Sequence, residues 1–303
     1  MDGNEWLAER FTHDTGRLRA VAYRMLGSLS EADDAVQEAW LRLSRTDADA
    51  IQNLSGWLTT VVGRVCLDML RSRAARREDS YDGEAYVPEP VVDRHGAADP
   101  EHQALTADSV GLALLVVLEA LSPAERLAFV LHDMFGVPFE EIAPVVDRTP
   151  AATRQLASRA RRRVRGSAPT PDADLARQRA VVEAFLLASR AGDFDALVAV
   201  LDPDVVLRSE YDPESAPVPP SVKRYLRGAR KVASQAALFG RGAGSGTRTR
   251  IALVNGAIGV VTTVDGRLHS VLGFTVTDGR IAEIDIQASP ERLRHVDPAF
   301  LDE

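Results

Sequence analysis

The stretch VPFEEIAPVVDRTPAATRQLASRARRRVR, residues 137–165, is the most distinctive part of this 303-residue chain. Its pattern predicts a helix over residues 138–146, a short turn, and a second helix over residues 150–165. Thr149 is suited to cap the second helix, and Pro150 is suited to its first turn. We therefore expect a helix-turn-helix in the middle of the chain.

The second of these helices has two different faces. Residues 148–165 contain seven arginines and no acid. At the helical period, small side chains gather on one face: Thr153, Ala157, Ala160 and Val164. The polar side carries Arg154, Gln155, Ser158, Arg159, Arg161, Arg162 and Arg165. This division is typical of a recognition helix in the major groove of DNA. A solvated arginine-rich helix is the weaker alternative, because it would normally intersperse glutamates among the cations.

Composition limits the possible classes of function. The length allows two or three domains, and the net charge of −8 excludes a general binder of polyanions. Basic residues gather instead at residues 64–77 and 148–165, so we expect weak DNA binding unless a partner positions the protein. The single cysteine, Cys66, excludes a disulfide framework and fits a reducing cytoplasm. The N-terminus lacks a signal-peptide pattern, and the longest apolar stretch, residues 110–121, is too short to span a bilayer.

The pattern along the chain changes from helical to mixed after residue 171. Helices are expected over residues 5–26, from Ser30 as cap to about Leu43, and over 56–73, 100–120 and 123–135, besides the two described above. Residues 78–100 and 166–171 have no periodicity and are interpreted as linkers. Beyond them, helices are expected at 174–191 and 194–201, and strands at 205–208, 249–254, 257–264, 269–277 and 280–287. Asp265-Gly266 and Asp278-Gly279 are suited to tight hairpin turns, so this part is predicted to be α+β with an antiparallel meander.

Two helices before residue 78 carry patterns that suggest binding. In the segment EADDAVQEAWLRL the inward stripe is Ala32, Ala35, Val36, Ala39 and Leu43. The opposite face carries Asp34, Gln37, Glu38 and Leu41. An acidic face is usually just solvated, but a leucine within it suggests a docking surface for a basic partner. The next helix ends in Arg71, Arg73, Arg76 and Arg77, which suit contacts with phosphates. Arg64 and Asp68 are four residues apart, so an ion pair within the helix and a DNA-binding role are both open.

Two segments resemble the conserved regions of bacterial extracytoplasmic-function sigma factors of the sigma-70 family. RLRAVAYRMLGSLSEADDAVQEAWLRL, followed by NLSGWLTTVVGRVCLDMLRSR, resembles their region 2. LSPAERLAFVLHDMFGVPFEEIAPVVDRTPAATRQLASRARRRVRG resembles their region 4. Residues 175–290 resemble the SnoaL-like (NTF2-like) extension carried by one large subgroup.

The resemblance implies a multidomain protein with two all-α sigma domains and an α+β SnoaL/NTF2-like cone domain. The boundaries expected are 1–77 for the helical bundle of region 2, 78–104 for a linker, 105–167 for the helix-turn-helix of region 4, 168–174 for a second linker, and 175–303 for the extension with its C-terminal tail. The function implied is that of a sigma factor, which binds core RNA polymerase and directs promoter recognition and transcription initiation in the cytoplasm. The fused extension is expected to regulate this activity.

The resemblance also assigns roles to single residues. Those for docking on the clamp helices of the largest polymerase subunit are Asp33, Asp34, Gln37, Glu38 and Leu41. Those for the −10 promoter element are Asn53, Trp57, Arg64, Asp68 and Arg71. Those for the −35 element are Arg154, Gln155 and Ser158 at base edges and Arg159 and Arg162 near phosphates. Many family members carry asparagine where this chain has Arg64.

The subgroup with this extension has three further motifs, and this chain departs from each of them. Its linker motif Trp-Leu-Pro-Glu-Pro is represented by Tyr86-Val87-Pro88-Glu89-Pro90, so Tyr86, Pro88, Glu89 and Pro90 are expected to form a regulatory linker. An Asp-Gly-Gly-Gly motif is replaced by the segment from Ser209 to Glu214, and an Asn-Pro-Asp-Lys-Leu-like motif by the segment from Ser289 to Leu293. These departures suggest a neighbouring subgroup.

Two other classes of function remain as alternatives. A one-component repressor or activator would need the helix-turn-helix but would leave the acidic docking helix unexplained. An enzyme tethered to DNA would use a pocket carboxylate as a general base, with Asp212, Asp285 and His269 as candidates. One strand face would carry Ile281, Glu283, Asp285 and Gln287. Exposure of that face to solvent would explain its carboxylates equally well, without a catalytic role. We expect no enzyme activity, no cofactor and no metal site, and only a small-molecule ligand in the extension's pocket as a further partner.

Overall fold

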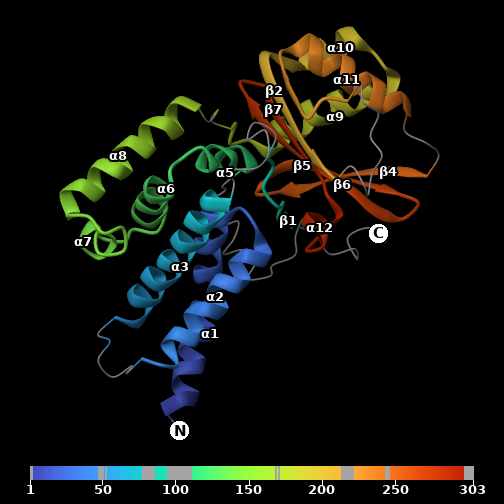
Figure 1. The fold of residues 1–303 in the computed structure, drawn as a ribbon. Helices are drawn as coiled ribbons and strands as arrows, with labels where there is room; N and C mark the ends of the chain where they lie inside the picture. The colour runs from blue at the N-terminus through green and yellow to red at the C-terminus, as the bar shows by residue number, and fades with distance from the viewer. Residues whose placement is uncertain are drawn as a thin grey trace. The chain divides into compact units, whose positions relative to one another are not determined.

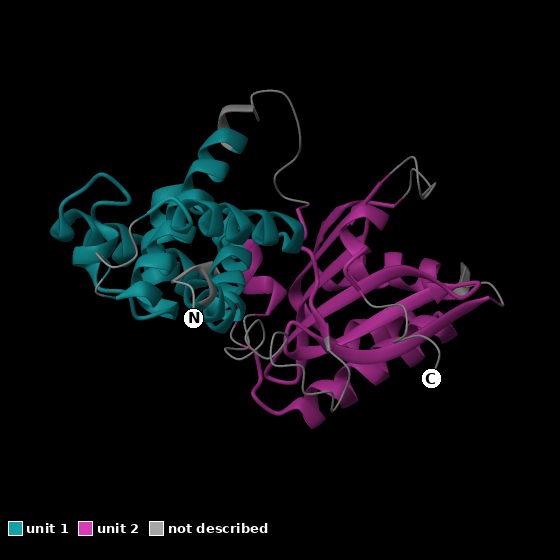
Figure 2. Ribbon diagram, turned by 90° about the horizontal axis from the view of Figure 1, so that it is seen from below, with its two compact units in different colours: residues 1–81, 98–107, 117–167 teal, residues 82–97, 108–116, 168–303 magenta. Residues whose placement is uncertain are grey.

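The described parts of the structure, a computed structural model, are residues 3–46, 51, 53–76, 86–93, 111–167, 169, 171–212, 222–242 and 246–296. Contacts between residues divide the chain into two units (Figure 2). The first comprises residues 1–81, 98–107 and 117–167, and the second comprises residues 82–97, 108–116 and 168–303. Both segments that resemble sigma regions thus fall in the first unit, while the described part of the linker belongs to the second. No helix among the described residues is long and apolar enough to cross a membrane.

The first unit begins with three long helices, α1 (Gly3–Leu26), α2 (Leu29–Leu43) and α3 (Leu54–Arg76), which pack on one another. The expected inward stripe of α2 is buried. The cap of α2 differs from the expectation, because Ser28 rather than Ser30 takes this position and its Oγ accepts a hydrogen bond from the amide of Glu31. Gly27, at a φ of 69°, supplies the left-handed turn that separates the first two helices.

The helix α3 is longer than its sequence pattern indicated. It begins at Leu54, and the side chain of Asn53 accepts a hydrogen bond from the amide of Gly56 at 3.1 Å. Cys66 lies fully buried on this helix, and burial raises the pKa of its thiol. This agrees with the interpretation of Cys66 as a small buried helix residue.

The rest of the first unit is built from short helices around a helix-turn-helix. These are α6 (Pro123–Phe129), the π-helical turn η4 (Val130–Met134), α7 (Phe139–Ile142) and α8 (Pro150–Ser167). They follow α5 (Leu112–Glu119), which begins in the second unit and whose last residues, 117–119, belong to the first. The helix expected over residues 123–135 is present as α6 and η4, and its hydrogen bonding changes to π-helical at Val130. The helix expected over residues 138–146 stops at Ile142, and turns continue to Asp147 at a φ of 54°. Of the helix expected over residues 100–120, the part before residue 111 lies outside the described residues.

The second unit is an α+β domain with a seven-stranded sheet in the order β1-β4-β5-β6-β7-β2-β3. Its helices are α9 (Leu175–Ala191), α10 (Phe194–Val200), α11 (Ala229–Gly242) and α12 (Pro290–Leu293). Its strands are β1 (Val92–Asp93), β2 (Leu201–Tyr211), β3 (Tyr225–Arg227), β4 (Thr247–Val254), β5 (Ala257–Val264), β6 (Arg267–Thr277) and β7 (Arg280–Ala288). Helices α9, α10 and α11 lie together against one face of the sheet (Figure 1), where apolar side chains such as Val182, Phe185, Leu197, Phe274 and Ile284 form the core.

The four strands β4 to β7 form the expected antiparallel meander. Three features went beyond the sequence pattern. The strand β2 is longer than residues 205–208 and pairs in parallel with β7. Helix α11 and strand β3 were not anticipated. Finally, Val92 and Asp93 of the linker join the edge of the sheet beside β4.

Candidate nucleic-acid interface

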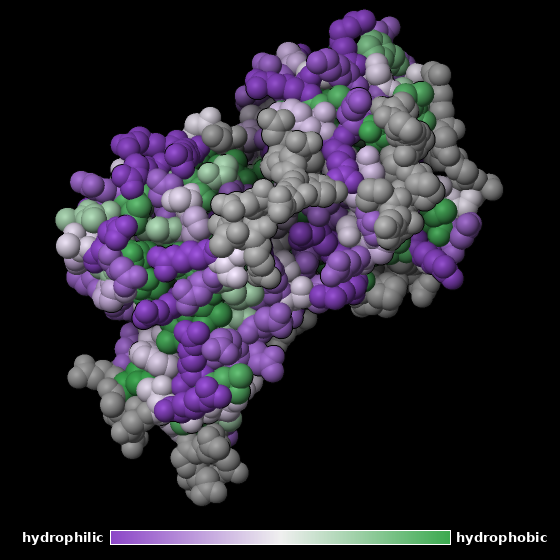
Figure 3. All heavy atoms as spheres, in the orientation of Figure 1, coloured by the Kyte–Doolittle hydropathy of each residue, from purple (hydrophilic) through white to green (hydrophobic). Residues whose placement is uncertain are grey.

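Helix α8 presents the two faces that its sequence predicted. Thr153, Ala157 and Ala160 are fully buried, while Arg154, Gln155, Arg159 and Arg162 are exposed and Ser158 is half-buried. Hydrophilic side chains gather over this helix in Figure 3. The Oγ1 of Thr149 accepts a hydrogen bond from the amide of Ala152 at 3.3 Å, as expected for the cap. The arrangement leaves a row of hydrogen-bond donors on a rigid helix, which is what contact with DNA requires.

The acids that α8 lacks come from other helices of the helix-turn-helix. Glu125 of α6, only 8% exposed in its side chain, binds Arg159 at 3.1 Å and Arg163 at 3.0 Å. Burial raises the pKa of this carboxyl, but hydrogen bonds from Ser122 and the two guanidinium groups outweigh it and hold the pKa below its ordinary value. Asp133 likewise binds Arg161 at 2.7 Å. Ion pairs between separate segments leave no spacing signal, so the sequence pattern did not reveal them.

The exposed arginines of α8 therefore differ in their freedom. The guanidinium of Arg154 lies 5.2 Å from the ring centre of Phe139, and this ring stacks on His132 at 3.7 Å. Arg159 forms an ion pair with Glu125 while half of its own side chain stays exposed, although the family resemblance places this arginine near phosphates. Within the described ranges, no carboxylate pairs with Arg162 or Arg165. Arg154 is thus held in place by an aromatic face, whereas Arg162 has its full charge available for a phosphate.

Three of the residues expected to bind the −10 element line one groove. Asn53, Trp57 and Arg64 contribute to it, together with Ile51, Thr60 and Val61, and its volume is about 550 Å³. Glu141, Pro144 and Val145 from the helix-turn-helix of the same unit complete its lining. Asp68 and Arg71 do not line this groove. They lie 3.9 Å apart in a weak ion pair, and the possible pair between Arg64 and Asp68 does not form.

Close packing inside the first unit holds this groove together. At Gly63 a Cβ atom would lie 3.0 Å from Leu131 and 3.1 Å from Leu127, so α3 and α6 approach closely there. The buried guanidinium of Arg126 donates to the carbonyl of Met25 at 2.7 Å and binds Glu119 at 2.9 Å. The helices expected to read the −10 element therefore pack directly on those of the helix-turn-helix.

The acidic face of α2 is only partly free. Asp34, Gln37 and Leu41 are exposed, the leucine by 41% of its surface. Asp33 is bound by Arg19 at 2.6 Å, and Glu38 by Arg42 at 3.0 Å one turn later. An exposed leucine between carboxylates is compatible with a docking surface, and the assignment of these five residues to polymerase docking stays a prediction.

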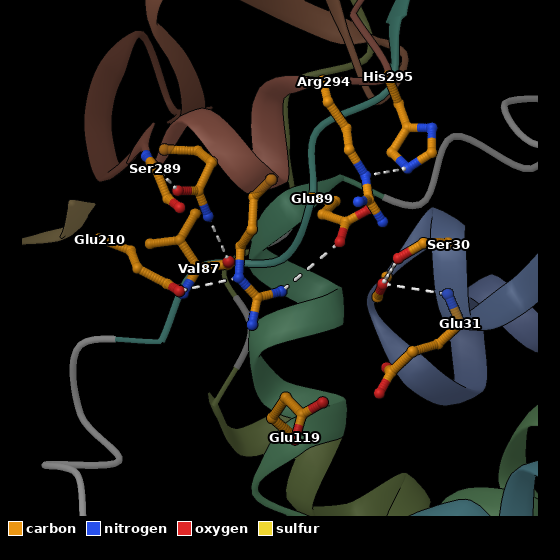
Figure 4. A network of polar contacts seen from close by, with 12 residues as sticks. Ser30, Glu31, Val87, Glu89, Glu119, Glu210, Ser289, Arg294 and His295 are labelled. Atoms are coloured by element: carbon orange, nitrogen blue, oxygen red, sulfur yellow. Dashed lines mark hydrogen bonds and ion pairs between the residues drawn. The ribbon is translucent and has the colours of Figure 1, made fainter. Parts of the chain in front are cut away.

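The linker segment Tyr86-Val87-Pro88-Glu89-Pro90 packs within the second unit. Val87 to Pro90 are buried, and Tyr86 is half-buried. The amide of Val87 donates to Glu210 at 3.0 Å, and its carbonyl accepts from Gln287 at 2.8 Å. Figure 4 shows Val87 beside Glu210, with Ser289 nearby.

Charged and backbone contacts extend this attachment at both ends. Arg292 lies over the ring of Tyr86 at 5.2 Å and binds Glu210 at 2.9 Å, with Glu89 at 3.9 Å. Further along, the side-chain oxygen of Asn255 accepts a hydrogen bond from the amide of Val91, and the backbone amide of Asn255 donates one to the carbonyl of Val91. Glu210 and Arg292 belong to the two segments whose motifs depart from the subgroup, and the structure brings both onto the linker.

The residues considered for catalysis, Asp212, Asp285 and His269, lie in different surroundings. Glu283 and Asp285 are buried rather than solvated, and both bind Arg208, at 2.7 and 3.1 Å. A bulge in the pairing of β6 with β7 lets Ile281 join the apolar core, so it does not share their face as expected. His269 is exposed on β6 and Asp212 is half-buried, so neither shares the buried surroundings of Asp285. Within the described residues, no group of three or more histidine, cysteine or acidic side chains is placed to hold a metal.

Comparison with known proteins agrees with this architecture. The family model for sigma-70 region 2 matches residues 11–76, and that for sigma-70 region 4 matches residues 111–164. The chain is 40% identical over 287 residues to the ECF RNA polymerase sigma factor SigJ of Mycobacterium tuberculosis, covering 91% of this chain and 89% of that protein. It is 35% identical to the probable ECF RNA polymerase sigma factor SigI of the same organism, covering 90% of each. The crystal structure of SigJ superposes with a TM-score of 0.71 at 36% identity, covering 95% of this chain and 98% of that one.

Proposed function

This chain belongs to the extracytoplasmic-function RNA polymerase sigma factors, and from that premise we propose that its SnoaL-like domain controls promoter use through the linker docked on it. As a sigma factor of this family, the protein binds core RNA polymerase and directs promoter recognition and transcription initiation. We propose that it acts in the cytoplasm and by binding alone, as the sigma factors that it resembles do, with Asp285 held in an ion pair by Arg208.

The roles of single residues follow the exposed surfaces. The face of α2 with Asp33, Asp34, Gln37, Glu38 and Leu41 docks on the polymerase. Asn53, Trp57 and Arg64 contact the −10 element, with Asp68 and Arg71 at the end of the same surface. On α8, Arg154, Gln155 and Ser158 contact bases of the −35 element, and Arg159 and Arg162 contact phosphates. The groove lining, the stacked Arg154 and the unpaired Arg162 support these assignments.

The observation that carries the regulatory proposal is the double hydrogen bond of Val87. Its amide and carbonyl are both satisfied by side chains of the SnoaL-like domain, Glu210 and Gln287. A linker fixed in this way has a defined end point, whereas a free linker of similar length has a broad distribution of lengths. Docking therefore sets the effective concentration at which region 4 meets the −35 element once region 2 is engaged.

Transcription from one promoter by the intact chain, by Tyr86→Ala, by Gln287→Leu and by a chain without residues 172–303 tests this proposal. At equal holoenzyme occupancy, the three changed proteins should alter output in the same direction, and the order of preference among −35 base variants should stay the same. Leu187→Ser, on the exposed surface of α9, serves as the control. Equal initiation by all of these proteins would remove the regulatory role.

A further inference from the structure

One face of the sheet carries two neighbouring glycines, Gly259 and Gly273, next to the buried carboxylate of Asp285; we call this pair the glycine strip. Gly259 of β5 pairs with Gly273 of β6, and Gly273 pairs with Asp285 of β7. Paired residues point to the same side of a sheet, and neighbours along a strand point to opposite sides. Phe274 faces the core under α9, so this glycine strip lies on the opposite face. Glycines in such a strip permit another segment to approach closely.

The segment that approaches is the start of α5. Leu112, the first residue of this helix, is only 4% exposed. A Cβ atom at Gly273 would lie 2.5 Å from Cδ1 of Leu112, and the next two nearest atoms also belong to Leu112. The space left between Leu112, the strip and Asp285 has a volume of about 10 Å³. That is room for one water at most, so the leucine fills its site closely.

The helix that carries Leu112 continues into region 4. The match to the region 4 family model starts at residue 111, one residue before α5 begins. The boundary between the two units falls inside α5, after residue 116. A helix is a rigid element whose turns are joined by hydrogen bonds, so a shift of its first turn shifts the rest. A movement of Leu112 would therefore move α5, the helix with which region 4 begins.

We propose that the glycine strip at Gly273 is a seat for Leu112, through which the SnoaL-like domain holds region 4 of the same chain. The inference rests on the proposed function and adds to it a second attachment, separate from Tyr86-Val87-Pro88-Glu89-Pro90. The two attachments hold the two ends of the interdomain segment. When Leu112 leaves the seat, the helix that begins region 4 loses its anchor, and the spacing set by the linker alone remains.

Three variants of the full chain probe the seat. Leu112→Ala empties it, and Gly273→Val fills it with a side chain that suits a strand. Combining the two substitutions gives the third. Leu272→Ala is the control, because Leu272 precedes Gly273 on β6 and packs against the apolar core instead. The first readout is amide exchange at Leu114 and Leu115, whose amides bond to the carbonyl of Gly111. The second is transcription at equal holoenzyme occupancy.

We expect exchange at Leu114 and Leu115 to become roughly tenfold faster or more in both single variants, and no faster in the double variant than in Leu112→Ala. Output should change in the same direction in all three, and the control should leave both readouts near the wild-type values. Unchanged exchange would show that there is no seat. Faster exchange with unchanged output would show that the seat is not coupled to region 4, even if Tyr86→Ala still altered transcription through the linker.

Discussion

The arginines of α8 illustrate how unlike residues of one type can be. Arg154 rests on the ring of Phe139, while Arg162 has no carboxylate partner among the residues described. A guanidinium fixed on an aromatic face has a defined direction, which suits bidentate bonds to a guanine edge. An unconstrained one contributes charge to the phosphate backbone at any sequence.

Substitution of these two arginines should separate base reading from phosphate binding. Arg154→Ala should cost roughly 1–3 kcal/mol and relax the preference at one base position of the −35 element. Arg162→Ala should weaken binding to all promoters alike and reduce the salt slope by about one. Fluorescence anisotropy of the holoenzyme on a set of −35 variants at several salt concentrations measures both, with Arg190→Ala on α9 as the control. If Arg154→Ala weakened every sequence equally, Arg154 would be a phosphate contact.

The buried cluster of the SnoaL-like domain should make stability depend on pH. Burial raises the pKa of Glu283 to about 7, with Arg208 opposing the shift and Asp285 adding to it. In the unfolded chain the group titrates near 4.3. Between these values the folded state holds a proton that the unfolded state has lost, so stability falls as pH rises from about 4.5 to 7 and stays lower above it.

Glu283→Gln should remove this part of the pH dependence. From pH 5 to pH 7.5, we expect the free energy of unfolding of the wild type to fall by about 1–3 kcal/mol relative to the variant. Urea unfolding of both proteins at the two pH values measures the difference. Glu183→Gln, an exposed change on α9, should follow the wild type. Parallel pH dependence in Glu283→Gln and the wild type would mean that Glu283 is ionised throughout.

How far the sequence predicts this protein depends on the range of each interaction. The cap at Thr149, the faces of α8 and the stripe of α2 are local, and helical periodicity was enough to predict them. The partners Glu125 and Asp133 of the α8 arginines, and the seating of Leu112 against Gly273, join segments that are distant in the chain. The spacing of these residues in the sequence therefore gives no sign of these contacts. The role of Ser28 instead of Ser30 was missed because two serines there are equally able to cap.

Among the elements, α2 offers the most direct test of polymerase docking. Its inner stripe packs on α1 and α3, so its outer face can change without loss of the fold. Asp34→Lys combined with Glu38→Lys should abolish capture of core RNA polymerase, because a basic partner surface would meet cations instead of carboxylates. The lost pair with Arg42 should cost only about 0.5 kcal/mol of stability.

The docking test is a pull-down with purified core polymerase. Circular dichroism on the same samples verifies the fold, and Glu183→Lys on α9 introduces the same charge reversal far from α2 in the sequence. Capture of the double variant at the wild-type level would exclude this face of α2 as the docking surface.

At the scale of the first unit, the groove between α3 and the helix-turn-helix limits access to the expected −10 residues. Asn53, Trp57 and Arg64 line it together with Glu141, Pro144 and Val145. A DNA strand has to compete with this packing, which lowers the apparent affinity of the free protein in proportion to the fraction that is open.

Loosening the packing at Gly63 should therefore favour binding of −10 DNA. Gly63→Leu would force α3 away from Leu127 and Leu131, and we expect the affinity for a single-stranded −10 oligonucleotide to rise by up to about tenfold. The matched control is Gly166→Leu, at a helical glycine with open space around it. Anisotropy titrations with the free proteins measure the effect. An unchanged or lower affinity in a folded Gly63→Leu variant would mean that the groove does not restrict the −10 residues.

The pairing of β1 with β4 has a consequence for the solubility of the protein. β4 would be an edge strand without the linker, and an uncovered edge is a template for pairing with a second copy. Val92 and Asp93 cover Val254 and Leu253, and the arginines Arg248 and Arg250 lie further along the same strand, where charge discourages such pairing. Asn255→Gly, which keeps the left-handed turn but removes the amide that accepts from Val91, should thus produce concentration-dependent association in sedimentation velocity. Every release of the linker for regulation would leave β4 as an unpaired edge strand that can pair with a second copy. The undocked state therefore has to be brief or shielded by the polymerase.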